Sequence, residues 1–453
     1  MNPARPSHHC LSLLRAALLL LLWAACGAAG AQMHLPSFRP PQSLALPQRI
    51  TEPLRNRVDS LVSGTELSDA LDLPALRQAS IVKLLRAHPD VLEADPLGAP
   101  IVRHEILAWS PSAAGLAAAQ AAGLSVASKS RLDGLDETVY VLQLAGAAGT
   151  AQALKALRAI DPQGIYDFNH VYMGSAASPL PVTGAADGAA QAPAGPARTL
   201  AVGLIDSGVD RNHIVFHGAA MHHWGCDGTP HPAAHGTAVA ALMVGQSGRF
   251  RGVAPDAGLY AADIYCDSAS GGSAERIAQA LAWFAREKIA VINLSLVGPP
   301  NQLLQKAVGL MLQRGHLLVA AVGNDGPAAA PLYPASYPGV VGVTGVDPQR
   351  HPLPEAARGP QVMFAAPGSQ MLSAAIGAPP YTPVRGTSFA APIVAALLAL
   401  QLERPDRDGA KSALAYLAKQ ALQGDGARAG TPDNATGYGV LGESARIDPQ
   451  RFR

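Results

Sequence analysis

The chain has 453 residues, with 34 Lys and Arg against 33 Asp and Glu, a formal net charge of +1 and only 4 Cys. At about 100 to 200 residues per domain, this length predicts two or three folded units. Balanced charge without a dense Lys/Arg stripe argues against nucleic acid as a partner. Four cysteines are too few for a scaffold held together mainly by disulfides.

Residues 1–31 have the pattern of a secretory signal: a basic start, an apolar run over Ala16–Ala25 and small residues up to Ala31. We therefore expect an exported protein, periplasmic or extracellular, cleaved after Ala31. The apolar run is shorter than the roughly 20 residues that a membrane span needs, so we expect no span in the mature form. A permanent anchor remains an alternative, and lipid attachment at Cys26 is disfavoured by Trp23.

Removal of the signal would take Cys10 and Cys26 with it and leave Cys226 and Cys266 as a pair in an oxidising compartment. We predict a disulfide between them. In the chain-entropy model, a loop of about 40 residues contributes roughly 4 kcal/mol. Two separate buried thiols are the alternative.

The residues after the signal divide into segments of different character. Residues 32–100 are Pro-rich at first and then helical around Leu67 to His88. Residues 101–173 predict a small α+β domain, and the Ala/Pro/Gly-rich residues 174–198 predict a linker. The elements expected in the α+β domain are a strand over Ile101–Trp109, a helix over Ala113–Ala122, a strand over Thr138–Leu144, a helix over Ala151–Ile160 and a strand over Ile165–Met173.

Residues 199–447 alternate regularly between apolar strands and helices, which predicts an α/β domain built on a doubly wound parallel sheet. The active residues of such sheets gather at the carboxyl ends of the strands. The expected elements are strands over Thr199–Ile205, Gly258–Ile264, Ile289–Leu296 and His316–Val322, and helices from His235 and over Ala274–Lys288 and Gln302–Arg314.

Three segments of this domain carry side chains suited to catalysis. Asp206 ends a buried strand, His235 begins a helix, and Ser388 enters an apolar helix from a glycine turn. Each alone has a structural explanation: a turn aspartate, a structural histidine and an N-cap serine. Six histidines also fall close together, but no pair has HExxH spacing, so we expect no metal site. They are His213, His217, His222, His223, His231 and His235.

The chain order Asp, His, Ser is that of the catalytic residues in subtilisin. The sequence resembles the subtilisin-like serine protease (subtilase) family in four ordered segments: the Asp206 box, the His-Gly-Thr at His235, the Gly-Asn-Asp-Gly at Asn324 and the Gly-Thr-Ser-Phe-Ala-Ala-Pro at Ser388. The resemblance covers about residues 199–447. It implies an endopeptidase that hydrolyses polypeptides through an acyl-enzyme intermediate.

The resemblance also implies a role for each residue. Asp206 would orient His235, which takes a proton from Ser388 and later gives it to the leaving amine. Asn324 and the Ser388 backbone N–H would hold the oxyanion. No cofactor is required by this scheme. The sequence contains no EF-hand loop and leaves open the scattered calcium sites common in the family.

The segment Ser295-Leu296-Val297-Gly298 resembles the strand with which subtilases bind substrate, although Val297 replaces a glycine that is usual there. The valine is expected to affect substrate preference more than catalysis.

The α+β domain resembles, in element order only, the propeptides of secreted subtilases. It would act as an intramolecular chaperone and inhibitor, and self-processing would fall within residues 174–198. The alternatives are a permanent partner-binding domain and, for the whole chain, a catalytically silent subtilase fold that only binds.

Overall fold

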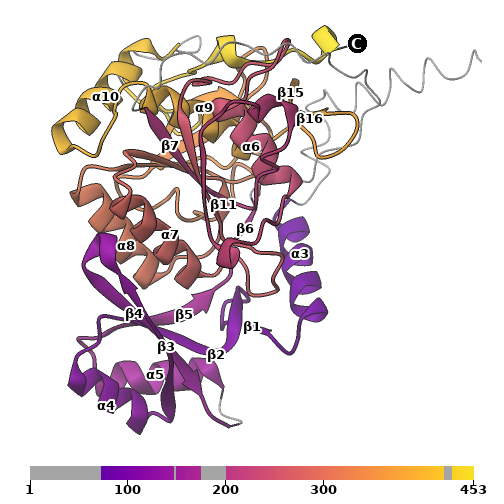
Figure 1. Ribbon diagram of the computed structural model, residues 1–453. Helices are drawn as coiled ribbons and strands as arrows, with labels where there is room; N and C mark the ends of the chain where they lie inside the picture. The colour runs from indigo at the N-terminus through magenta and orange to yellow at the C-terminus, as the bar shows by residue number, and fades with distance from the viewer. Residues whose placement is uncertain (1–72, 147–148, 175–199, 423–430, 453) are drawn as a thin grey trace, which may run out of the picture. The chain divides into compact units, whose positions relative to one another are not determined.

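The computed structural model of the chain (Figure 1) describes residues 73–146, 149–174, 200–422 and 431–452. These belong to one compact unit, Gly64–Arg453. The expected signal, the Pro-rich stretch, Cys10, Cys26 and all but the first residue of the predicted linker lie outside the described residues. No helix in the described part is long and apolar enough to cross a membrane.

A seven-stranded sheet forms the centre of the C-terminal region. Its strand order is β14-β13-β12-β10-β7-β9-β8, and every neighbouring pair is parallel. This confirms the predicted fold class. The strands are β7 (Ala201–Asp206), β8 (Met221–Trp224), β9 (Gly258–Asp263), β10 (Val291–Leu294), β12 (Leu317–Ala321), β13 (Val341–Val346) and β14 (Val362–Pro367).

Helices cover both faces of this sheet, which is why its strands are almost wholly apolar. Helices α6 (Ala234–Val244), α9 (Thr387–Ala399) and α10 (Arg407–Gln420) share one hydrophobic core with the sheet. Helices α7 (Ala274–Arg286) and α8 (Gln302–Gln313) form a second core on the opposite face. Two short ladders complete the region: β15 (Met371–Ala374) with β16 (Tyr381–Val384), and β11 (Leu296–Val297) with β6 (Met173–Gly174).

The N-terminal region contains a five-stranded antiparallel sheet, in which β2 pairs with β1, β4 and β5. The strand β3, which pairs with β4, was not predicted, because most of its side chains are exposed and show no apolar alternation. The elements are α3 (Leu73–Ala87), β1 (Leu92–Ala94), β2 (Pro100–Trp109), α4 (Ala113–Ala121), β3 (Leu124–Leu132), β4 (Glu137–Leu144), α5 (Thr150–Ile160) and β5 (Ile165–His170).

Strand β2 shows how the two regions share a core. Successive side chains of a strand point to opposite faces. Ile106 and Ala108 pack with α4 and α5, whereas Leu107 and Trp109 join the core that contains α7 and α8. The second half of β2 is therefore buried on both faces, and one of these faces packs against helices of the C-terminal region.

Candidate active site

Asp206 and His235 meet at the carboxyl edge of the parallel sheet. Asp206 is the last residue of β7, and His235 is the second residue of α6. Nδ1 of His235 lies 2.8 Å from Oδ1 of Asp206, and it must donate because an ionised carboxylate only accepts. The same oxygen accepts from the Ser207 backbone N–H at 2.7 Å. Gly236 allows this packing, since a Cβ there would lie 2.1 Å from the Ser207 carbonyl oxygen.

Ser388 is the second residue of α9 and is fully buried. The N-cap of this helix is Gly386, whose φ of 128° favours glycine, so Ser388 is not an N-cap serine. The ring of Phe389 lies 5.5 Å from the His235 ring, which places the start of α9 beside the histidine. The Ser388 carbonyl accepts a hydrogen bond from the Ser295 hydroxyl at 3.0 Å.

Asn324 is tied to the same end of α9. Its Oδ1 accepts from the Thr387 N–H at 3.1 Å, and the Thr387 hydroxyl accepts from the Gly323 N–H at 3.3 Å. Gly323 has a φ of 102°, and a Cβ there would lie 2.5 Å from Leu332. These reciprocal bonds bring the predicted oxyanion asparagine to the turn that carries Ser388.

The charge state of His235 is set by two opposed effects. Burial acts to lower its pKa, but the charge of Asp206 and the hydrogen bond to it leave the pKa above its usual value. The Nε2 atom is buried and has no hydrogen-bond partner among the described residues. The imidazole thus has one nitrogen fixed by a carboxylate and the other available to exchange a proton.

The predicted substrate strand is occupied by the chain itself. Leu296 and Val297 of β11 pair antiparallel with Gly174 and Met173 of β6, and both β11 residues are fully buried. The valine at position 297 therefore does not prevent strand pairing.

Tyr172, which directly precedes β6, is held by contacts with the residues that follow β11 and with the loop before α7. Tyr172 packs so closely on Gly298 that a Cβ at Gly298 would lie 2.3 Å from its ring. Its hydroxyl donates to the Pro299 carbonyl at 2.7 Å, and its N–H donates to the Gly272 carbonyl at 2.8 Å. The segment that leaves the N-terminal region is thus held on both sides.

Polar side chains of β5 cap two helices of the C-terminal region. Asp167 accepts from the Gln302 N–H at 2.7 Å at the start of α8. Asn169 accepts from the Glu275 N–H at 3.2 Å at the start of α7. Asn301, the N-cap of α8, donates back to the Phe168 carbonyl at 2.9 Å. These residues satisfy N–H groups that a helix leaves free in its first turn.

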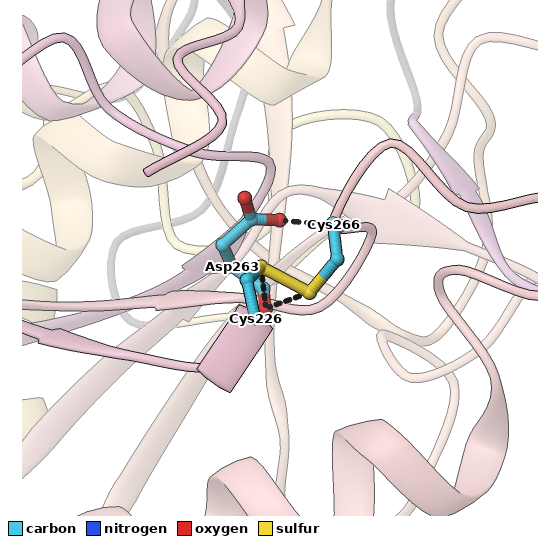
Figure 2. A group of neighbouring side chains, drawn as sticks. All are labelled: Cys226, Asp263 and Cys266. Carbon is cyan, nitrogen blue, oxygen red and sulfur yellow. Dashed lines mark hydrogen bonds between the residues drawn. A yellow bond between two sulfur atoms is a disulfide. The ribbon is translucent and has the colours of Figure 1, made fainter. Parts of the chain in front are cut away.

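The predicted disulfide is present between Cys226 and Cys266, and Figure 2 shows it beside Asp263. Oδ1 of Asp263 accepts from the Tyr265 and Cys266 N–H groups at 2.9 and 3.0 Å. Among the described residues, these three side chains are the one His/Cys/Asp/Glu group close enough to share an ion. Because the sulfurs are bonded to each other, neither offers the thiolate that a metal binds.

The six clustered histidines do not form a common site. His213 has its Nε2 2.8 Å from the Pro380 carbonyl, and His222 stacks on Tyr260 at 4.2 Å. No three of the six come within ligand distance of one another in the described part of the chain.

Sequence reasoning missed the residues that join the two regions. Asp167, Asn169 and Asn301 were not singled out, nor was the contact of Arg77 in α3 with Asp325. The alternation of β5, in which Asp167 and Asn169 lie on one face, was the available signal.

The seven-stranded parallel sheet defines an α/β protein, in which a hydrogen-bonded aspartate–histidine pair lies beside the start of the helix that carries Ser388. Residues 197–439 match the model of the subtilase family. The chain belongs to the subtilase family.

Two similar proteins and one solved structure place the chain among its relatives. It is 35% identical to M-protease of Shouchella clausii over 44% of this chain and 53% of that protein. It is also 35% identical to subtilisin Savinase of Lederbergia lenta, over 44% of this chain and 74% of the relative. The chain thus spans about half the length of M-protease. The crystal structure of fervidolysin from Fervidobacterium pennivorans superposes with a TM-score of 0.61 at 19% identity, covering 76% of this chain and 61% of that one, which supports the fold alone.

Proposed function

We propose that the chain is a serine endopeptidase that hydrolyses polypeptides and is made as a precursor. The hydrogen bond between Asp206 and His235, next to the helix start that carries Ser388, is the observation that carries this proposal. In this scheme Ser388 attacks the peptide carbonyl as His235 removes its proton, and an acyl-enzyme forms as the peptide C–N bond breaks. His235 returns the proton to the leaving amine. These residues supply the proton transfers without a cofactor.

The oxyanion of the tetrahedral intermediate would lie between the Asn324 amide and the Ser388 N–H. The contact of Asn324 Oδ1 with the Thr387 N–H supports this role, because it turns the amide oxygen toward the helix and leaves the amide nitrogen as the donor. This assignment rests on the orientation of the side-chain amide at the turn before Ser388.

The N-terminal region is proposed to inhibit the enzyme. Met173 and Gly174 pair with Val297 and Leu296, as a substrate strand would, and Tyr172 packs on Gly298. A polypeptide substrate could not use this segment until β6 leaves it. We propose that processing takes place within residues 174–198 and that the precursor is exported through its N-terminal signal, which the disulfide supports.

The test is to express the full chain and its Ser388→Ala variant side by side and to determine the N-termini of the products. Wild type should yield a new N-terminus within residues 174–198 and should react with a fluorophosphonate at Ser388. Ser388→Ala should stay uncleaved and unlabelled. Ser128→Ala, which removes an exposed hydroxyl on β3, is the matched control and should behave as wild type.

The competing function is that of a catalytically silent binding protein. It would be supported if a folded and processed wild-type protein never reacted with the fluorophosphonate. Processing of Ser388→Ala in the absence of any other protease would argue against self-cleavage.

A further inference from the structure

Three segments that lie apart in the chain are bonded to one another around the two proposed oxyanion donors. They are the asparagine turn (residues 323–326), the loop of residues 353–357 between β13 and β14, and the serine turn (residues 385–388) that leads into α9. The loop is anchored in the core, because Leu353, Ala356 and Ala357 are buried. Contacts of the two turns with this loop therefore tie both donors to a fixed part of the fold.

Backbone hydrogen bonds join the loop to the asparagine turn. The Gly326 N–H donates to the Glu355 carbonyl at 2.9 Å, and the Ala357 N–H donates to the Gly323 carbonyl at 3.0 Å. The asparagine turn is bonded in the same way to the serine turn, through the reciprocal bonds described above. Two sides of a triangle of segments are thus held by backbone groups and by side chains in the turns.

An ion pair between Arg385 and Glu355 forms the third side, from the serine turn to the loop. Nε of Arg385 lies 2.7 Å from Oε1 of Glu355, and Nη2 donates to Oε2 at 2.9 Å. Such a bidentate pair fixes orientation as well as distance, because the planar guanidinium matches the two carboxylate oxygens. The side chains are 43% and 18% exposed, so the pair contributes little to overall stability. Its position next to Gly386, the N-cap of α9, gives it a local effect instead.

We propose that Arg385 and Glu355 are positioning residues for the oxyanion site. Their ion pair closes the ring of contacts that holds the Asn324 amide in place relative to the Ser388 N–H. Donors stabilise an oxyanion only when they lie about 2.7 to 3.1 Å from it, and a displacement of about 1 Å can cost about 100-fold in rate. Both residues act through the turns that they hold and not through the substrate. This inference rests on the proposed endopeptidase function and on the role proposed for Asn324.

The first test does not require activity. Amide hydrogen exchange, resolved to single residues, is compared between the full chain carrying Ser388→Ala and the same chain with Arg385→Ala added. The Gly326 and Thr387 N–H groups should exchange at least about 10-fold faster without the ion pair, because both donate within the ring of contacts. Lys411→Ala, which breaks an exposed ion pair of α10, should leave both rates unchanged. Unchanged exchange with Arg385→Ala, or an equal increase throughout β10, would overturn the inference.

The second test separates positioning from charge in the processed chain, with kcat expressed per Ser388 that reacts with a fluorophosphonate. Arg385→Ala and Glu355→Ala should each lower kcat about 10- to 100-fold and change KM less than about threefold, because the lost arrangement matters only in the transition state. A direct effect of charge would have opposite signs for the two variants, since loss of the Glu355 carboxylate favours a nearby oxyanion. An unchanged or higher kcat with Glu355→Ala would therefore overturn the inference.

The third measurement asks whether Arg385 acts through Asn324. When Asn324→Ala is already present, adding Arg385→Ala should lower kcat less than about threefold, because the donor that the ion pair positions is gone. Losses that multiply in full would overturn the positioning role and leave the proteolytic function standing. No cleavage of any peptide and no labelling of Ser388 in the wild type would refute the proposed function, and hydrogen exchange would then decide on the ring of contacts alone.

Discussion

The disulfide between Cys226 and Cys266 should make a large contribution to stability, and its replacement by two alanines measures this directly. The bond closes a loop with a sequence separation of 40. In the chain-entropy model, such a loop contributes about 4 kcal/mol. Four non-glycine residues beside the bond have left-handed backbone: Cys226, Asp227, Cys266 and Asp267, with φ between 50° and 55°. Relaxation of this strain after bond removal offsets part of the loss, so we expect about 2 to 4 kcal/mol.

The measurement is guanidinium unfolding of the Cys226→Ala/Cys266→Ala protein in the Ser388→Ala background, where self-digestion should not interfere. Tryptophan fluorescence is a suitable probe, because Trp224 lies two residues before Cys226 and stacks on Trp283. The midpoint should fall and the denaturant dependence should rise, because the unfolded chain without the cross-link exposes more surface. Ser128→Ala should leave the midpoint unchanged. A loss below about 0.5 kcal/mol would refute the assignment of this stability to loop closure.

Removing the bond should also loosen the neighbouring substrate segment. The loop after Cys266 leads to Gly272, whose carbonyl accepts the Tyr172 N–H. Limited proteolysis of the alanine variant should therefore release the N-terminal region faster than proteolysis of the parent protein does.

Three further results are expected at the site and at the junction between the regions. Asn324→Asp keeps the acceptor for the Thr387 N–H but removes the amide donor, so kcat should fall about 100- to 1,000-fold, the size of the loss when subtilisin loses its oxyanion asparagine; a kcat within threefold of wild type would contradict this role. The pKa of His235 is raised by its aspartate partner against the opposing effect of burial, and the base must be neutral, so kcat/KM should rise with pH around a midpoint above about 6.5; a midpoint below that value would count against it. Burial and the nearby charge of Glu105 raise the pKa of Glu275, so docking of the N-terminal region should be strongest below pH about 4.5 and weaken as pH rises through the raised pKa. Glu275→Gln should flatten this dependence in limited proteolysis of the Ser388→Ala chain, and an unchanged pH profile would exclude Glu275 as the group responsible.

The sequence located the parts of the fold whose patterns are local. Helix α7, expected over Ala274–Lys288, ends at Arg286, and α8 begins at the predicted Gln302. Strand β3 was not predicted, because its side chains are mostly exposed and do not alternate between apolar and polar residues. The edge strand β8 reads Met-His-His-Trp, a run with neither alternation nor an apolar stretch.

The structure joins Asp206 to His235 and Asn324 to the start of α9, but the surroundings of these residues were less accessible from the sequence. Asp206, His235, Asn324 and Ser388 occur in motifs a few residues long, which can be recognised without knowledge of distant contacts. The ion pair between Arg77 and Asp325 joins residues far apart in the chain and has no local pattern. Such a contact depends on how the two regions pack against each other. No periodic pattern in a single sequence indicates that packing.

Helices α7 and α8 each have two side-chain acceptors at the first turn, and this bears on whether the C-terminal region stays folded after the N-terminal region has left. Each helix has its own N-cap, Ser273 or Asn301, which accepts a hydrogen bond from within the helix. Asp167 and Asn169 of β5 supply a further acceptor to each helix. If β5 leaves, water can take over those two N–H groups, while both helices keep their internal caps. We therefore expect the N-terminal region to speed the folding of the C-terminal region more than it stabilises the folded state of that region. Once separated, the C-terminal region would keep its form through slow unfolding.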